Sequence, residues 1–491
     1  MNFAYIHCMK ILYSNLILTV FIFISGWNGG LTQSLAELIA SAHDQSPAND
    51  IAETRYLNAR LYYQAYRAEF RPNIMLNATV PNLVRSISSI ITDDGGEIFV
   101  NRSVLTNAAS VSLNYDIRAT GGQIYASTGL ERLDILSSPQ RTSYFATPIR
   151  IGFIQPISRY NPFTWQDKKE PVRLTIAEKR YYQEKEMITR QIVQAYFQLM
   201  MAQVNLEYAS DQVENNRDLL AIAQQRFDKG FTGREELLQL EINVNGSLAE
   251  QSAARVHAEL ATDELNSVLG NEEAQSYNLE TLDYRDIYID ESTALQQFRL
   301  NNPLYDELHL SEINAEESIV EARARGRTVN IIGQVGFSQT NEKLRNAYRD
   351  LDDQEIFSLG IQVPITDWGL TDIRRQTAQV NHDLTQKTNA WEIIKEERSL
   401  LSGIKQFNLQ KTQLTLLQNS MELAREHVTI TEQRYLKGSS TINDLNLALE
   451  NENRRRNSYY QSLREYWDLY YEIRSRCLYD FERNEIILYE H

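Results

Sequence analysis

The sequence predicts a mixed fold in which long α-helical hairpins alternate with antiparallel β-strands. Three observations predict it. Sequence motifs recur at a constant offset, so the chain contains an internal duplication. Two proline-free stretches, 172–302 and 365–491, carry apolar residues at helical spacing. Other segments alternate apolar and polar residues with a period of two, which is typical of half-buried strands.

The duplication is clearest at two motifs. GFIQPIS at 152–158 recurs as GIQVPIT at 360–366, and QRFDKG at 225–230 recurs as QRYLKG at 433–438, both 208 positions later. From the proline of the first motif to the glycine of the second there are 74 positions in each copy. A conserved length between copies indicates a structural constraint. The predicted boundaries are residues 35–301 for the first repeat, 302–480 for the second and 481–491 for a C-terminal tail.

A signal peptide is expected at the N-terminus. Residues 11–24 form an apolar run that follows Lys10 and precedes a polar stretch. The run is shorter than the ~20 apolar residues that a transmembrane helix needs, and its flanks are typical of a secretory signal. We therefore assign residues 1–34 to a removed signal peptide and expect the mature chain to leave the cytoplasm.

Composition excludes several classes of function. The net charge of −16 argues against a nucleic-acid partner. Downstream of the signal peptide only Cys477 remains, so an internal disulfide is excluded. The seven histidines are scattered, and neither a nucleophile elbow nor a phosphate-binding glycine loop occurs. We predict that the protein is not an enzyme and has no catalytic residues, cofactor or metal site.

Each copy is expected to carry a long helical hairpin. Residues 366–436 lack proline and could form one helix on the order of 100 Å long. Both long helices end at a Lys-Gly pair, at 229–230 and 437–438, and glycine just past a helix is a stop signal. The other expected helices are the return helices at about 233–269 and 441–476, and short helices at about 35–70 and 303–326.

The alternating segments are predicted to be strands. The most regular are 109–117 and 356–363, and the others are 74–80, 123–130, 148–156 and 329–338. A soluble sheet with one wet face gives the same pattern and is commoner. A membrane barrel places apolar residues toward lipid and polar residues toward a lumen over about 9–11 residues per strand. Export, the long helices and the small, uncharged polar face favour the barrel.

We count two core strands in each copy and therefore four per chain. The first copy also holds 48 extra residues between its matched ends. The sequence leaves open whether these residues add strands or form a plug or an external flap. Four strands cannot close a barrel, since small closed barrels have about eight. Open edges cannot face lipid, so copies of the chain must close the barrel together. Two copies would give eight strands and three would give twelve.

This layout resembles the TolC-like outer-membrane efflux protein family over about residues 35–480. The motifs are QPI at 155–157 and VPITDWG at 363–369, where strands meet helices, and the Arg-Phe/Tyr-x-x-Gly tips at 226–230 and 434–438. The resemblance implies a homotrimer with a twelve-stranded outer-membrane β-barrel continued by a periplasmic α-helical barrel. It implies a passive exit duct of a tripartite efflux or type I secretion system, opened by docking of a periplasmic adaptor (membrane fusion) protein that joins it to an inner-membrane transporter.

The resemblance also implies an acidic aperture. Glu236 and Asp444, each six residues past its tip glycine, match the family's acidic positions. Carboxylates ringed at a constriction would repel one another, favour cations and respond to pH. Alternatively, Thr441-x-x-Asp444 forms a capping box and Glu236 occupies a first turn, where the helix dipole favours an acid. Leu447 replaces a second family acid, which weakens a two-ring gate.

Docking and interface residues complete the predicted sites. The adaptor-docking tips are Gly230, Phe231, Thr232, Gly233, Gly438, Ser439, Ser440 and Thr441, although any helical hairpin needs such turns. The predicted membrane-interface or junction residues are Pro156, Trp165, Pro364 and Trp368, and the tryptophans could instead pack where strands meet helices. Acidic segments 93–94 and 350–353 lack calcium-ligand spacing and are expected in outer loops. The competing class is an exported coiled-coil structural or adhesion protein without a channel.

Overall fold

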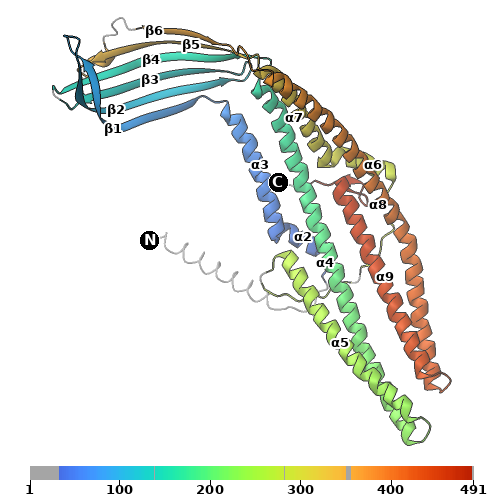
Figure 1. The fold of residues 1–491 in the computed structure, drawn as a ribbon. Coiled ribbons are helices and arrows are strands. Elements are labelled where there is room, and N and C mark those ends of the chain that lie inside the picture. The colour runs from blue at the N-terminus through green and yellow to red at the C-terminus, as the bar shows by residue number, and fades with distance from the viewer. Residues whose placement is uncertain (1–32, 138, 272, 281, 350–354, 489–491) are drawn as a thin grey trace, which may run out of the picture. The chain divides into compact units, whose positions relative to one another are not determined.

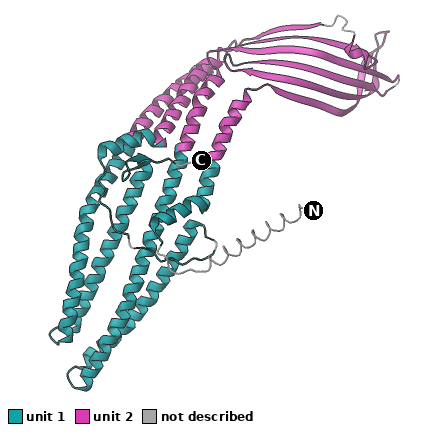
Figure 2. Cartoon of the chain, turned by 180° about the vertical axis from the view of Figure 1, so that it is seen from behind, with its two compact units in different colours: residues 1–55, 179–302, 396–491 teal, residues 56–178, 303–395 magenta. Residues whose placement is uncertain are grey.

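The computed structural model describes residues 33–488, except 138, 272, 281 and 350–354. The predicted signal peptide, apart from residues 33 and 34, and the acidic segment 350–353 lie outside the described residues. The described chain forms two compact units (Figure 2). The first unit, hereafter the helical unit, contains residues 33–55, 179–302 and 396–488. The second unit contains residues 56–178 and 303–395.

The helices of the two halves have matching lengths. Two helices of 67 residues, α4 and α8, are each followed by a helix of 36 residues, α5 or α9 (Figure 1). Two helices of 23 residues, α3 and α7, precede the strands of their halves. These lengths support the interpretation of an internal duplication. The bounds are α2 Leu35–Gln45, α3 Pro47–Glu69, α4 Pro162–Asp228, α5 Arg234–Leu269, α6 Glu291–Asn301, α7 Pro303–Arg325, α8 Leu370–Leu436 and α9 Ile442–Cys477.

Aromatic side chains of α8 and α9 form one part of the core of the first unit. Phe407 is fully buried and stacks on Tyr466, with 4.8 Å between the ring centroids. Trp467 and Tyr470 pack beside them. The Tyr470 hydroxyl donates to the Asp480 carboxylate at 3.2 Å, which ties the segment after α9 to this core. That segment includes a small hairpin of β7 Tyr479–Asp480 and β8 Glu485–Ile486.

The second unit contains one antiparallel sheet of six strands, paired in sequence order. The six segments predicted to be strands each correspond to one of these six strands, and the question left open for the 48 extra residues is thereby decided. The extra residues of the first copy are strands, because that copy supplies four strands and the second copy supplies two. The bounds are β1 Asn73–Ile91, β2 Glu97–Ile117, β3 Gly122–Ile135, β4 Arg141–Ile157, β5 Val329–Asn341 and β6 Glu355–Gln362, with a short 3₁₀ helix at Asn346–Tyr348.

The register gives the sheet an apolar face and a polar face. One row of paired residues crosses all six strands and is apolar throughout, namely Ile74, Leu113, Ala126, Ile151, Val335 and Phe357. The adjacent row, whose side chains point to the opposite face, consists of Asn73, Asn114, Tyr125, Gly152, Gln334 and Ser358. The alternation seen in the sequence is thus aligned across every strand.

A search of the described helices finds none with enough length and apolar character to cross a membrane.

We predict that Phe407→Ala destabilises the helical unit, because deleting a buried ring leaves a cavity and costs about 3–5 kcal/mol. Thermal unfolding followed by helical circular dichroism of the full chain measures this. The control is Gln406→Ala on the same helix, where the side chain is exposed. Equal midpoints for the two variants would show that the aromatic core contributes little.

Candidate functional site

The tips of the two hairpins turn by the same local mechanism. Gly230 and Gly438 have φ of 77° and 76°, a left-handed conformation that glycine adopts without steric cost. The Phe231 amide donates to the Arg226 carbonyl at 2.8 Å, and the Ser439 amide donates to the Arg434 carbonyl at 2.9 Å. These six-to-one hydrogen bonds close a Schellman motif at the end of α4 and of α8.

Asp444 forms a capping box at the start of α9. The Thr441 hydroxyl accepts a hydrogen bond from the Asp444 amide at 3.2 Å, and the Asp444 carboxylate accepts one from the Thr441 amide at 2.9 Å. The hydroxyls of Thr441 and Ser440 also donate to this carboxylate, at 2.8 and 3.2 Å. The hydrogen bond from the Thr441 amide, followed by those from the two hydroxyls, lowers the pKa of Asp444, which remains exposed and ionised near neutral pH.

Glu236 has a different partner, on the other hairpin. Its carboxylate accepts a hydrogen bond from the Tyr435 hydroxyl at 2.6 Å, which joins the first turn of α5 to the last turn of α8. The Tyr435 side chain is only 2% exposed. Burial, reinforced by the Glu236 carboxylate, raises the pKa of Tyr435, so the phenol stays a donor at neutral pH. The Tyr435–Glu236 hydrogen bond is hereafter the latch.

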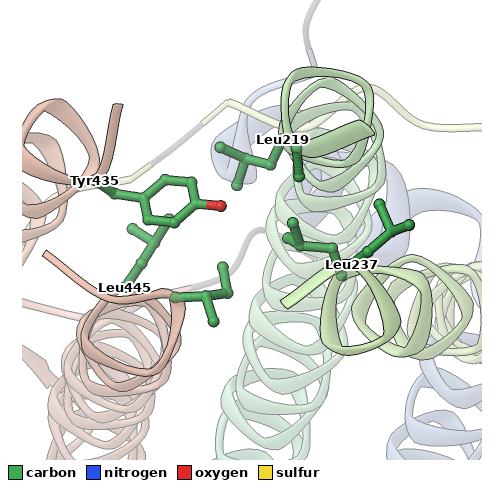
Figure 3. Packing of buried hydrophobic residues seen from close by; sticks show 7 residues of the cluster. Leu219, Leu237, Tyr435 and Leu445 are labelled. Carbon is green, nitrogen blue, oxygen red and sulfur yellow. The ribbon is translucent and has the colours of Figure 1, made fainter. Parts of the chain in front are cut away.

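A hydrophobic cluster surrounds the latch. All four helices contribute to it, and in Figure 3 the Tyr435 side chain extends from α8 toward the α4–α5 hairpin. The Arg226 guanidinium lies 5.9 Å from the Tyr435 ring centre and donates to the Leu436 carbonyl. The buried members are Leu219, Ala223, Leu237, Leu240, Tyr435, Ile442 and Leu445. The two hairpins of one chain are therefore joined at their tips by apolar packing around two charge-assisted hydrogen bonds, the latch and the bond from Arg226 to the Leu436 carbonyl.

A further polar contact joins the hairpins about two turns further along α5. The Asn243 amide on α5 donates to the Asn446 side-chain oxygen on α9 at 2.9 Å. Both amides are half-buried. Since amide–amide hydrogen bonds are neutral and weaker than bonds to a carboxylate, this contact is secondary to the latch.

The structure pairs Glu236 with Tyr435, whereas Asp444 makes its contacts within its own hairpin. Tyr435 was missed by the sequence reasoning. A usable signal existed, because the two copies of the tip motif differ at this position. Phe227 stands where the second copy has Tyr435, and only the tyrosine can donate to a carboxylate. The difference indicates an asymmetric contact between hairpins.

The remaining tip residues are largely open to solvent. Phe231 is 81% exposed, and Gly230, Gly233, Gly438, Ser439 and Thr441 are also exposed, whereas Thr232 and Ser440 are half-buried. An exposed aromatic ring at a hairpin tip is a feature that a partner surface could cover.

The predicted junction residues differ from one another in exposure. Trp368 is 92% exposed with a φ of 55°, and it precedes α8 beside Pro364. Trp165 is half-buried in α4, where the Lys168 ammonium lies 4.4 Å from its ring centre. Pro156 lies within β4, opposite Asn330 of β5. Within the described ranges, no group of three or more acidic, histidine or cysteine side chains is arranged to hold a metal ion.

Comparison with known proteins confirms the resemblance to the outer-membrane efflux family. Residues 123–271 match the family described as outer membrane efflux protein. No curated protein sequence matches. Among solved structures, the Campylobacter jejuni CmeC outer membrane channel is 15% identical with a TM-score of 0.64, covering 92% of this chain and 88% of that one.

Two further structures give similar values. The Vibrio cholerae outer membrane protein VceC is 13% identical with a TM-score of 0.64, covering 90% of this chain and 95% of that one. The open state of the Neisseria gonorrhoeae MtrE outer membrane channel is 13% identical with a TM-score of 0.61, covering 90% and 88%. At these identities the likeness is one of fold.

We predict that Tyr435→Phe loosens the tips while leaving the rest of the helical unit intact, because it removes the latch hydrogen bond but keeps the ring in the cluster. Hydrogen exchange measured by mass spectrometry should show protection falling by about tenfold around 226–240 and 434–446, the value expected for a bond worth about 1.5 kcal/mol. Phe227→Tyr, at the matching position of the first copy, is the control. Unchanged protection in Tyr435→Phe would mean that the latch is dispensable.

Proposed function

We propose that this chain is a passive outer-membrane duct, the exit channel of a tripartite efflux or type I secretion system. It acts as a homotrimer with a transmembrane β-barrel in the outer membrane and an α-helical barrel in the periplasm. The match to the outer membrane efflux family and the fold shared with outer-membrane channels support this proposal. Those relatives are channels, so we also propose that the chain is not an enzyme.

The observation that carries the proposal is the two-faced sheet. The apolar row is continuous over six strands, and its end members Ile74 and Phe357 are 70% and 78% exposed. A monomeric soluble protein rarely leaves so large an apolar surface in water. Strands of a membrane barrel present apolar residues to lipid and polar residues to the lumen, and this sheet has both faces.

Assembly into several copies follows from the same unit. The sheet has two unpaired edges, β1 and β6, which lipid does not tolerate. The part of α8 in this unit also carries an exposed apolar stripe with spacings of seven, four and seven residues, which is typical of a helix–helix seam. Its members, each more than 60% exposed, are Ile373, Val380, Leu384 and Trp391. Copies of the chain are the partners that both features require.

The latch is the element that we propose holds the duct closed. Opening an aperture formed by hairpin tips requires the two hairpins of each chain to part, and Tyr435 and Glu236 join them. An adaptor protein that docks on the exposed tips, including Phe231, would supply the energy to break the latch. The inner-membrane transporter would drive export, because a passive duct supplies none of its own.

The competing function is an exported coiled-coil protein without a channel. The stripe on α8 is compatible with it, because a rod also uses helix–helix seams. The exposed apolar row of the sheet is not, since a rod has no use for a lipid-facing surface.

The test of the duct is conductance. Full-length, signal-cleaved protein added to a planar lipid bilayer should produce discrete current steps. Glu236→Ala should raise the open probability by about tenfold per broken latch bond, because such a bond to a carboxylate is worth about 1.5 kcal/mol. Glu235→Ala, which removes the neighbouring exposed carboxylate, is the control and should behave like the natural protein. A protein that never inserts or conducts would refute the duct.

A second prediction separates the two roles of Asp444. We propose that its carboxylate both caps α9 and rings the aperture with those of the other copies. Asp444→Asn should then lower the preference for cations over anions, measured from reversal potentials in a salt gradient. Thr441→Ala breaks the same capping box without removing charge, so it should loosen the tip but keep the ion preference. Unchanged selectivity in Asp444→Asn would leave capping as the only role.

A further inference from the structure

We propose that the transmembrane barrel has eighteen strands, six from each of three copies, closed by antiparallel pairing of β6 in one copy with β1 of the next. The inference rests on the proposed function and extends it to the width of the pore. Three features of the sheet support it, namely the two exposed edges, the position of the extra strands of the first copy and the stagger between neighbouring strands.

The two edges are open to a partner along their whole length. All residues of β1 are exposed except the half-buried Ser88, and all residues of β6 are exposed except the half-buried Ile356. The inner strand β3, by contrast, contains only half-buried and buried residues apart from three exposed ones. The unpaired edges therefore coincide with the most exposed strands of the sheet.

The edges are also complementary in direction and in face. Six antiparallel strands in sequence order make β1 and β6 run in opposite directions, so β6 can pair with β1 of a second copy without breaking the alternation. The apolar row begins at Ile74 on β1 and ends at Phe357 on β6. The seam therefore joins apolar to apolar side chains on the outside and polar to polar side chains on the inside.

The extra strands belong to the wall of the barrel. The turn between β2 and β3 is held against the end of β4 and the segment that follows it. The Asn161 side-chain amide donates to the Arg118 carbonyl at 2.7 Å, and that of Gln155 donates to the Thr120 carbonyl at 3.1 Å. With continuous pairing from β1 to β4, these bonds exclude a plug or a flap for the extra residues.

The stagger of the strands fixes the register of the seam. Asn73 on β1 and Ser358 on β6 lie in one row perpendicular to the strands. In a closed barrel the strands are tilted, so this row does not meet its own start. Ser358 therefore lies opposite a residue further along β1 of the next copy, and the number of residues between that residue and Asn73 is the offset. An offset of six residues per copy tilts the strands by about 35°, and eight by about 43°, both within the usual range of ~35–45°. Odd offsets are excluded because they would exchange the two faces. An offset of six places Gly360 opposite Asn77, and eight places Gln362 opposite Asn77.

Six strands per chain make the pore wider than that of a twelve-stranded barrel. With strands about 4.8 Å apart and tilted by about 40°, eighteen strands give a backbone diameter of about 36 Å, against about 24 Å for twelve. Barrels of 16–18 strands leave an aqueous channel. We infer that the outer opening accepts bulkier cargo than a twelve-stranded barrel would.

The test uses disulfide cross-links between copies of the full chain in outer membranes. Pairs of cysteines are introduced on the polar face, Asn77→Cys with Gly360→Cys and Asn77→Cys with Gln362→Cys. One of the two pairs should convert the chain into covalent dimers and trimers under oxidation, reversed by reductant. Gly360 has room for a side chain, since an added Cβ would meet its nearest atom at 3.9 Å. The natural chain, whose buried Cys477 is its only described thiol, gives the background.

A third pair tests the narrower alternative. If β1 and β2 were excluded from the wall, β6 would pair with β3 of the next copy, and an offset of four residues would bring Gly360 opposite Ser127. Cross-linking of Ser127→Cys with Gly360→Cys, and of neither Asn77 pair, overturns the inference while the duct survives. Absence of cross-links in all three pairs overturns the seam. Counting eighteen or twelve strands at the membrane level by electron cryo-microscopy checks either result without any substitution.

Discussion

Backbone N–H and C=O groups at the edge of a sheet must be paired when the sheet lies in lipid. In the proposed duct, this requirement determines that the sheet of one chain pairs with the sheets of other copies. The six-stranded sheet has an apolar face across all its strands, which is suited to hydrocarbon, but it has two free edges. One chain cannot satisfy both demands, since its edges lie at opposite ends of the sheet. Copies of the chain can, because β1 and β6 have opposite directions and matching faces. In the proposed duct, self-association and membrane insertion would both follow from this one unmet hydrogen-bonding demand.

In the helical unit, noncovalent contacts hold the two long hairpins together at their ends. A cluster of apolar side chains supplies most of the contact between the hairpins. The hydrogen bond between the Tyr435 phenol and the Glu236 carboxylate adds a directional contact within that cluster. Burial keeps Tyr435 protonated, so the bond persists near neutral pH. Glu236 is only half-buried, and its carboxylate can therefore be rehydrated when the hairpins separate. A contact of this kind can be broken by a docking partner at modest cost.

Much of this architecture follows from sequence patterns with a clear physical origin. The long helices were predictable because most of their length lacks proline and Gly230 and Gly438 mark their ends, although α4 begins at Pro162 and contains Pro171. The strands were predictable because apolar and polar residues alternate along a two-faced sheet. The sequence left open whether the inserted segment adds strands, because that segment has no counterpart in the second copy to reveal its role. Helix α6 was missed although Asp290 caps it by accepting from the Thr293 amide at 2.8 Å, a local signal that a short polar sequence hides. Tyr435 was missed because its partner lies 199 positions away, beyond the reach of periodicity.

The most direct test of the central claim is electron cryo-microscopy of the full-length, signal-cleaved protein extracted from outer membranes and embedded in lipid nanodiscs. The account predicts a particle with threefold symmetry, hollow along its axis, with the sheets of three chains closed into one barrel within the lipid. A protein that is soluble without detergent, or a thin two-chain rod with its sheets in water, would contradict it.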